Sequence, residues 1–564
     1  MVLRFVAFQH ANSSFAVGRN AQLIEGYMEQ LQQGQEDQLE QRQHEQEDHL
    51  VPAVPHLIVT GERKLDVEES PQGFRVKQDN KSSRLVTLHD VWFCPRLSPY
   101  PEVMDLCLSF SLFKCLRRRF AGYRLAKAGS SWAFRFVCDG LLRPEENHSG
   151  KRLFKVISSE LSFASDFYYS SLPVASLGAW SALLHFTLSA MICLTIVLIF
   201  PSILFLVTMA TGAGPIGDPI MLVLAPVVAL VTVTVEIVEM VNSVRSNWTK
   251  ISMVGHIIKS SRWSCIICNC MLRCKYPERW KDEMGQNLLL KPNLPWTHLF
   301  KRIFFPRKNR YKPAIEVSAH VKDAVIKSFK KSGGKLSNGV ATLQLRCPHF
   351  TWACYSNNTY TILVWYIATF IVETKCSSPV SVPTPNMVVA TSLSRYCAYL
   401  VAEVPDLLPD NAAWTKVRYQ KVKKCIEAVC NRSGARSDLL ESFGDVNYNS
   451  NYNSNEIVEI GLSPANQLTE EDVVKIGSKL GKQLVEHGSS QGHSEEQRTS
   501  REEAVWEILA EFWSEMILYL APSDNVKGHI EALRRGGELI TLLWTLLLHA
   551  GITSRPLGRD IPIP

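Results

Sequence analysis

Charged side chains are absent from two long stretches of the sequence, residues 179–210 and residues 219–235. A helix in a soluble protein keeps one face toward water, so it rarely stays uncharged over such a length. A bilayer core of roughly 30 Å needs about 20 apolar residues of helix. The first stretch reaches that length by itself. The second reaches it when the glutamate-containing residues that follow position 235 are included. Together with the Gly/Pro turn between them, they predict a transmembrane helical hairpin over residues 178–241.

Motifs of known catalytic centres are also missing, or they lie in the wrong setting. The sequence contains no H-E-x-x-H and no G-x-x-x-x-G-K-[ST]. Residues 212–217 spell G-x-G-x-x-G, but a dinucleotide site needs a soluble βαβ unit around these glycines. Here they lie between two apolar runs and predict a turn. Residues 488–492 spell G-x-S-x-G in a polar stretch and not on a strand-to-helix turn. We therefore expect no catalytic residue, no cofactor and a non-enzymatic protein.

The net charge is small for the length of the chain, +7 over 564 residues. A charge of this size does not indicate a nucleic-acid partner. The first ten residues carry too short an apolar run for a signal peptide. The 15 cysteines are therefore expected to be reduced thiols and not a disulfide framework.

Basic residues flank the predicted hairpin on both sides, whereas its turn holds only the acidic Asp218. Because cations collect on the cytoplasmic side of short membrane flanks, both large flanks are predicted to be cytosolic and the turn lumenal or external. This predicts a multi-pass membrane protein whose glycosylation sequons stay unmodified. The flanking cations are Lys151, Arg152, Lys155, Arg245, Lys250, Lys259, Arg262, Arg273 and Lys275, and the sequons are at Asn12, Asn80, Asn147, Asn247, Asn357 and Asn431.

The N-terminal flank predicts two segments. Residues 1–50 begin with an amphipathic helix that runs into a Gln/Glu-rich tract, which is either a solvated helix extension or disordered. Residues 51–177 form a small mixed region in which HLIVTGE and RLVTLHDVWFC are expected strands. A helix is expected over residues 102–124, with apolar residues at three-to-four spacing. Its basic cluster, Lys114, Arg117, Arg118 and Arg119, indicates either contact with anionic lipid headgroups or, preferably, a solvated helix end.

Several sequence blocks resemble a large plant membrane-protein family that is abundant in grasses. The blocks SSFAVGRNAQLIEGYM, DLCLSFSLFKCLRRRFAGY, VISSELSFASDFYYSSLP and SNWTK resemble its central domain of unknown function 4220. LSRYCAYLVAEVPDLLPD and the block from Trp506 to Leu547 resemble its usual partner, the domain of unknown function 594. Members typically carry further transmembrane helices before the first block, so the resemblance implies an N-terminally truncated member. It implies no reaction.

Residues 242–311 form a basic connector that contains four closely spaced cysteines, Cys265, Cys268, Cys270 and Cys274. Closely spaced thiolates can hold zinc, but a structural zinc site usually pairs two separated clusters, and no second cluster lies at a suitable spacing. Cysteines beside a membrane and basic residues are also targets for palmitoylation. Metal binding, acylation and unmodified thiols all stay open, the last being favoured.

Residues 312–564 predict a C-terminal helical domain of seven helices, interrupted by flexible inserts at residues 444–455 and 488–500. Thr469 and Asp472, three residues later, have the form of a capping box and predict the beginning of one of these helices. Residues 359–372 are too short an apolar run to span a bilayer and predict a buried core helix, as does the run from Leu539. In the helix from Ala504, the apolar positions share one face, and Glu507, Glu511 and Glu515 form an acidic stripe on the opposite face.

Glu236 and Glu239 are the two carboxylates at the end of the second apolar run. Ionisable groups in a bilayer are costly and often functional, so they could line an ion path. Their place at the cytosolic end favours carboxylates that reach interfacial water. The sequence thus predicts a mainly α-helical membrane protein with partners in the bilayer and among unidentified proteins, and with homo-oligomerisation left open. The favoured function is a membrane-tethered interaction or scaffold protein, and the alternative is a transporter or channel component.

Overall fold

The computed structural model divides into two compact units, and the mainly α-helical prediction is confirmed. Unit 1 comprises residues 1–126 and 156–280, and unit 2 comprises residues 127–155 and 281–564. Each unit is described by itself. The structure describes residues 19–42, 57–62, 67–70, 73–76, 85–123, 131–141, 149–170, 187, 189–196, 198, 202, 219–259, 272–273, 280–287, 314–354, 357–376, 383–430, 468–489 and 495–555.

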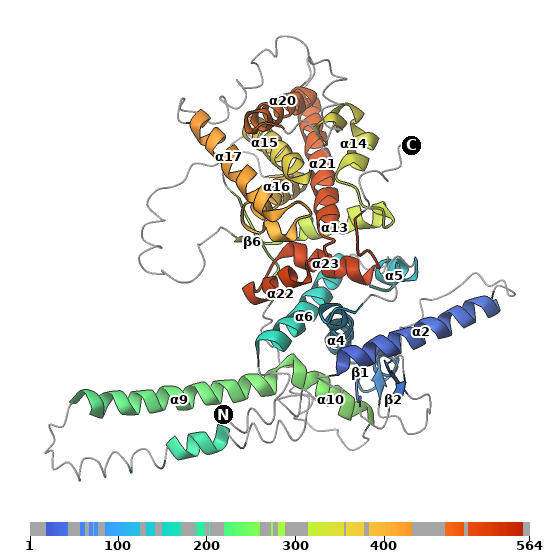
Figure 1. Ribbon diagram of the computed structural model, residues 1–564, viewed down its shortest axis with the longest axis vertical. Helices are drawn as coiled ribbons and strands as arrows, with labels where there is room; N and C mark the ends of the chain where they lie inside the picture. Colours follow the sequence, from blue (N-terminus) through green and yellow to red (C-terminus); the bar gives the residue numbers. More distant parts are fainter. Residues whose placement is uncertain are drawn as a thin grey trace. The chain divides into compact units, whose positions relative to one another are not determined.

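Among its described residues, unit 1 combines helices with two short antiparallel strand pairs, β1 with β4 and β2 with β3 (Figure 1). The helix predicted after Glu102 is present, and the Gln/Glu-rich tract continues a helix as far as Arg42. The elements are α2 (Asn20–Arg42), β1 (Ile58–Thr60), β2 (Val67–Ser70), β3 (Gly73–Val76), β4 (Val86–Thr87), α3 (Leu88–Trp92), α4 (Pro101–Phe120), the part of α6 (Ser149–Tyr169) from Val156 on, α9 (Pro219–Arg245) and α10 (Asn247–Lys259).

The second predicted strand, RLVTLHDVWFC, is mostly wrong, because only Val86 and Thr87 pair as a strand. The chain then turns into α3. The Thr87 side chain accepts a hydrogen bond from the Asp90 N–H, and the Asp90 carboxylate accepts one from the Thr87 N–H at 2.8 Å. This capping box begins a helix in a stretch whose alternating apolar residues resemble a strand.

The basic cluster of α4 is not a solvated helix end, and it does not form an open surface for lipid headgroups. Lys114 and Arg118 are each only 2% exposed. Lys114 forms an ion pair with Glu62, and Arg118 Nε lies 2.8 Å from Glu25 Oε2. Burial lowers the pKa of Lys114, while the neighbouring Glu62 opposes that shift. Buried charges need such partners, which the sequence supplies from elements far away along the chain.

Unit 2 is a helical domain, and the part of it that the structure describes has one short strand pair, β5 with β6 (Figure 1). Residues 127–155 and 281–287 also belong to it, so the division of the chain differs from the predicted boundary at residue 312. Its elements are α5 (Ser131–Arg135), the π-helix η2 (Phe136–Leu141), β5 (Glu283–Gly285), β6 (Ala314–Glu316), α13 (Ala319–Ser332), α14 (Val340–Arg346), the 3₁₀ helix η3 (Pro348–Ala353), α15 (Asn358–Cys376), α16 (Pro385–Glu403), the 3₁₀ helix η4 (Pro405–Leu407), α17 (Ala412–Cys430), α20 (Glu470–Ser489), α21 (Glu495–Leu520), α22 (Val526–Arg535) and α23 (Leu539–His549).

The core of unit 2 is built around α15, α16, α20 and α21. The apolar run in α15 is buried from Thr359 to Thr369, which confirms the predicted core helix. Gly477 and Gly481 lie where α20 crosses α15. A Cβ atom on Gly477 would lie 2.9 Å from Ile367 Cβ, and one on Gly481 would lie 2.9 Å from Ile371 Cβ. The two glycines therefore permit the close approach of these helices.

Three helix boundaries in unit 2 differ from the predictions. The last predicted helix is two helices, because Gly536 ends α22 with φ of 88° and α23 begins at Leu539. The predicted insert at residues 488–500 is helical at both ends, since α20 runs to Ser489 and α21 begins at Glu495. Glutamate, glutamine and arginine after Ser494 are good helix formers and extend α21 toward its N-terminus. The insert predicted at residues 444–455 lies outside the described residues.

Candidate functional site

α9 has the length and composition of a membrane span. Within the described residues, Pro226–Arg245 is one helical segment long and apolar enough to cross a bilayer. The whole of α9 has 27 residues and is about 40 Å long. Large apolar side chains point outward along it, with Leu230 68% exposed and Val231 56% exposed. Contiguous apolar exposure of this extent is unusual for a helix in water and is typical of one in lipid.

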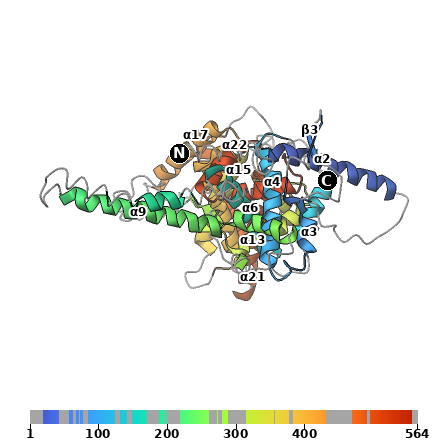
Figure 2. The same ribbon diagram turned by 90° about the horizontal axis from the view of Figure 1, so that it is seen from below.

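The described part of the first apolar run lies beside α9 (Figures 1 and 2). Residues 189–196 are helical, and their less exposed members are Ser189, Ile192, Cys193 and Ile196. Positions that repeat at three and four residues share one face of a helix. The Ser189 hydroxyl donates a 2.8 Å hydrogen bond to Glu236 Oε2 in α9. The structure thus joins the two apolar runs through a carboxylate singled out in the sequence and a serine that was not.

The other residues singled out in the apolar region are only partly described. Glu236 is half-buried, whereas Glu239 is exposed. The glycines of the turn at residues 212–217 and the four cysteines at positions 265, 268, 270 and 274 lie outside the described residues. Within the described part of the chain, no three metal-ligating side chains converge on one point.

Ser246 connects α9 to α10, which packs in the core of unit 1. Ser246 separates α9 from α10 and is fully buried. Its hydroxyl donates to the Ser243 carbonyl at 2.8 Å and accepts from the Thr249 N–H at 3.2 Å. It therefore completes the end of one helix and caps the beginning of the next.

Trp248, two residues after Ser246, packs α10 into an aromatic cluster. Its ring centroid lies 5.4 Å from that of Phe110, 5.6 Å from Phe113 and 5.3 Å from Phe163, all at steep angles. The indole N–H donates to Asp166 at 3.3 Å. Edge-to-face rings of this kind stabilise a core beyond their buried area. The membrane-length helix is thus attached firmly to the folded part of unit 1.

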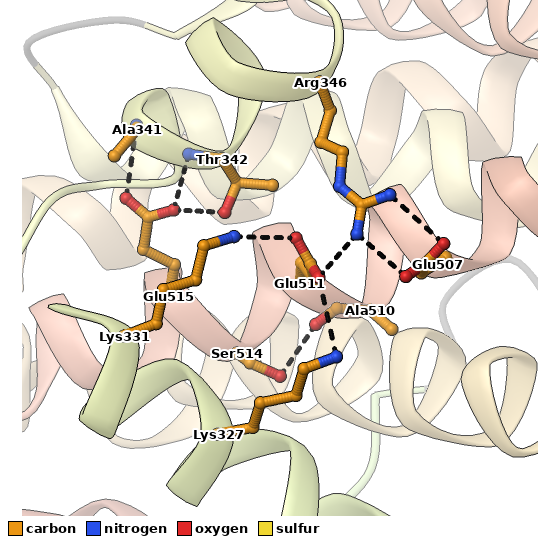
Figure 3. A network of polar contacts seen from close by, with 10 residues as sticks. All are labelled: Lys327, Lys331, Ala341, Thr342, Arg346, Glu507, Ala510, Glu511, Ser514 and Glu515. Atoms are coloured by element: carbon orange, nitrogen blue, oxygen red, sulfur yellow. Dashed lines mark hydrogen bonds and ion pairs between the residues drawn. The ribbon is translucent and has the colours of Figure 1, made fainter.

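In unit 2, the carboxylates Glu507, Glu511 and Glu515 of α21 form a polar network with α13 and α14 (Figure 3). The predicted acidic stripe exists, but it is not a water-facing surface opposite the core. Glu511 has a side chain only 16% exposed. The apolar face of α21 packs in the core as predicted, with Trp513 and Ile517 fully buried. α14, which was not predicted from the sequence, covers part of the acidic face.

Glu515 caps the N-terminus of α14 from a different helix. It accepts hydrogen bonds from the backbone N–H groups of Thr342 at 2.9 Å and Ala341 at 3.3 Å. It also accepts from the hydroxyls of Thr342 and Ser337. Burial raises the pKa of Glu515, although the hydrogen bonds from Thr342 oppose this shift. The N-cap residue of α14 is glycine, which has no side chain to perform this role.

Arg346 holds the other end of α14 against α21. Its guanidinium donates to both carboxylate oxygens of Glu507, at 2.8 and 3.2 Å, and to Glu511 at 2.9 Å. Two lysines of α13 also reach Glu511, Lys331 at 3.2 Å and Lys327 at 3.9 Å. Burial raises the pKa of Glu511, but hydrogen bonds from Arg346 and Lys331 outweigh it and hold that pKa below its usual value.

A groove of about 280 Å³ lies beside this network. The walls come from α13 and α21, and the beginning of α16 and one residue of α14 complete it. This concave polar surface is the candidate functional site of unit 2, and it could hold a charged group of a ligand or partner. The charged and polar residues that line it include Asp323, Lys327, Lys331, Asn386, Glu507 and Glu511.

The described residues thus define a mainly helical protein with a helix of membrane-spanning length and a polar groove in its C-terminal unit. The family model DUF4220, a domain of unknown function, matches residues 1–292, and the model DUF594, a protein of unknown function, matches residues 498–552. The first match covers more than half of the chain, which therefore belongs to the DUF4220 family. No curated protein and no solved structure matches it.

The two matched segments relate differently to the structural units. The DUF4220 match continues past residue 280 into unit 2, where it includes β5 and Asn287. Asn287 donates to the Ala398 carbonyl at 3.3 Å and to Tyr419 at 2.8 Å, so it is part of the core of unit 2. The DUF594 match covers most of α21 and all of α22 and α23.

Proposed function

We propose that this chain is an integral membrane protein whose two apolar runs form an antiparallel helical hairpin, and that its cytosolic unit 2 binds partner proteins. The observation that carries the proposal is the 2.8 Å hydrogen bond between Ser189 and Glu236. A polar side chain in lipid is stabilised by a partner on a neighbouring helix. Each of these residues provides that partner for the other.

The less exposed residues of the two runs support one register. In an antiparallel pair, a step forward in one helix is a step backward in the other. With Ser189 facing Glu236, Ile192 lies opposite Val233, three residues further along each helix in opposite directions. In the same way, Cys193 lies opposite Thr232. None of these four side chains is fully exposed. The exposed apolar residues of α9 are left for contact with lipid.

Site-specific photocrosslinking tests the hairpin. With benzoylphenylalanine at position 189 in native membranes, we expect crosslinks within one chain to peptides that contain residues 229–240. The matched control carries the photoreactive residue at Leu194, which is 53% exposed, and should react mainly with lipid. Equal crosslinking to α9 from both positions, or none from position 189, would contradict the proposed pairing.

The interaction role of unit 2 is supported by its groove, and Ser246 and Trp248 attach α9 to the core of unit 1. A tether of this kind suits a protein that presents a binding surface at a membrane. No catalytic residue or cofactor enters the proposal. Proteins labelled in proximity to the C-terminus should include specific membrane neighbours. Recovery of bulk cytosolic proteins alone would contradict the tethered-scaffold function.

A transporter or channel component is the second candidate function, favoured by the membrane position of Glu236. In that case Glu236 lies on an ion or proton path, and Glu236→Gln abolishes flux in reconstituted vesicles. In the anchor proposed here, glutamine retains a hydrogen-bond acceptor for Ser189, so the hairpin persists and no flux is lost. Ion flux that depends on Glu236 would favour the transporter function over the scaffold.

A further inference from the structure

We propose that the groove between α13 and α21 binds an acidic segment of a partner protein, with Lys327 and Lys331 as its principal contacts. The inference rests on the proposed interaction function and specifies the chemistry of the partner. Both lysines line the groove, and both project from the same face of α13, one helical turn apart (Figure 3). A partner carboxylate placed between them could accept hydrogen bonds from both ammonium groups.

Lys327 and Lys331 are accessible at this groove, whereas Glu507 and Glu511 are already paired with Arg346. The side chains of Lys327 and Lys331 are 72% and 48% exposed, but that of Glu511 is only 16% exposed. Glu507 accepts two hydrogen bonds from Arg346, which also reaches Glu511. Lys327 and Lys331 are therefore more accessible to a ligand from solvent than Glu507 and Glu511 are.

The pairing of Lys327 within the protein is loose, whereas Lys331 donates a 3.2 Å hydrogen bond to Glu511. Lys327 lies 3.9 Å from Glu511 and shares that carboxylate with Lys331 and Arg346. Exposed ion pairs contribute little to stability, so a partner carboxylate could take over Lys327 at small cost. Lys330 and Lys335 are also exposed and form no ion pair with the described residues.

The shape of the groove favours a polypeptide over a flat membrane surface. Its floor includes the small residues Ala324 and Ser328 of α13 and Ala510 and Ser514 of α21, each pair one turn apart. These side chains leave a concave volume of about 280 Å³, in which side chains of an extended segment fit. Lipid headgroups in a bilayer surface would contact the outer lysines but would not fill the hollow between the helices.

Asp323 makes one end of the groove less favourable for a partner carboxylate than the other. It is exposed, lines the same groove and lies one turn before Lys327 on α13. A partner carboxylate near Asp323 is repelled, so the acidic residues of the segment should lie toward Lys331. Asp323→Asn is therefore expected to tighten binding, which distinguishes a specific site from general attraction to lysines.

The test uses the full chain in nanodiscs of neutral phosphatidylcholine and a fluorescein-labelled peptide of alternating glutamate and serine, followed by fluorescence anisotropy. We expect saturable binding that weakens at least tenfold in the Lys327→Glu/Lys331→Glu variant and tightens two- to threefold in Asp323→Asn. A matched control reverses Lys421 and Lys423 on α17, which are 55% and 39% exposed, and should bind as the unchanged protein does. Lys327→Gln, a milder change, should show an intermediate loss, and its melting temperature reports whether the fold is retained.

Three results would overturn the inference. One is equal binding of a peptide in which glutamine replaces glutamate, and another is an equal loss in the α17 control. The third is binding of phosphatidylserine vesicles through Lys327 and Lys331 while the acidic peptide does not bind, which would assign the lysines to lipid. Resistance of the same protein to extraction by alkaline carbonate tests membrane anchoring separately. If the unchanged protein resists alkaline extraction but does not bind the acidic peptide, the groove is rejected as its site and the membrane anchor is not.

Discussion

The carboxylate of Glu515 in α21 accepts a 2.9 Å hydrogen bond from the backbone N–H of Thr342 and so caps a helix from outside that helix. The N-cap of α14, Gly339, has φ of 89°, and a Cβ atom there would lie 2.2 Å from Phe512. No other residue fits without displacing that ring. Since the capping side chain cannot come from the N-cap itself, α21 provides it.

Glu515→Ala should destabilise unit 2, because it leaves the backbone N–H of the buried Thr342 without an acceptor, whereas the Ala341 N–H keeps the Ser337 hydroxyl at 3.1 Å. The expected cost is about 1–3 kcal/mol. Thermal unfolding followed by tryptophan fluorescence should show a lower melting temperature. Glu507→Ala, which removes a more exposed ion pair, is the control and should cost about 0.2–1 kcal/mol. Equal effects of the two variants would contradict the capping role.

Gly477→Leu should destabilise the crossing of α15 and α20. A Cβ atom at this position already lies 2.9 Å from Ile367 Cβ and 3.0 Å from the Val364 carbonyl oxygen, so the helices must separate. Overpacking costs about 1–3 kcal/mol, although leucine is the better helix former. Denaturant unfolding measures the change. Gly488→Ala in the same helix is the control, since its Cβ would lie 3.4 Å from its nearest neighbour, and should cost little or nothing.

Trp248→Ala should destabilise unit 1 by about 3–5 kcal/mol, as large aromatic truncations in a core do. Trp248 is 1% exposed and contacts three phenylalanine rings. Trp248→Phe keeps a ring in the cluster but loses the hydrogen bond to Asp166, so it should cost less. Limited proteolysis of unit 1 in membranes should then detect faster cleavage in Trp248→Ala than in Trp248→Phe. Equal resistance of both variants to protease would contradict the anchoring role of the ring.

His529 should make unit 2 less stable in mild acid. It is fully buried, its ring stacks on Trp544 at 4.2 Å, and its Nδ1 lies 3.0 Å from Thr541 Oγ1. Burial, with a smaller effect of Arg555, lowers the pKa of His529 from 6.5 to about 3. Between these values the unfolded chain binds the proton and the folded chain does not, so stability falls as the pH falls below 6.5.

The expected loss from this histidine is about 2 kcal/mol between pH 6.5 and 4.5. Unfolding by denaturant at several pH values measures it. His529→Phe keeps an aromatic ring beside Trp544 and cannot titrate, so its stability should depend less steeply on pH by that amount. The same pH dependence in the variant and the unchanged chain would show that His529 is charged in the folded state or accessible to protons.

Features that depend on local or periodic patterns of residues were predicted correctly from the sequence. The spacing of Leu509, Trp513 and Ile517 identified the core face of α21, and Thr469 with Asp472 identified the beginning of α20. The Thr469 N–H donates to the Asp472 carboxylate at 3.0 Å, as the capping box predicts. The apolar composition of residues 219–241 likewise predicted a helix of membrane length, and α9 has that length.

Features that depend on contacts between distant segments were predicted incorrectly or missed. The cations of α4 have the sequence pattern of a solvated helix end, and only the fold reveals Glu62 and Glu25 beside them. α14 has seven residues and a glycine N-cap, and it owes its stability to Glu515 and to the pairs of Arg346. Helices this short are marginal by themselves. Neither the groove nor Ser189 as the partner of Glu236 could be inferred without the spatial arrangement.

Membrane topology is the most direct test of the central claim, the hairpin with both flanks on the cytosolic side. A flexible insert with one glycosylation sequon is placed between Gly214 and Pro215, and the chain is synthesised with microsomal membranes. We predict that the inserted sequon is glycosylated while the native sequons at Asn147 and Asn357 stay unmodified. Glycan on either native sequon, or none on the insert in chains that resist alkaline extraction, would contradict the hairpin.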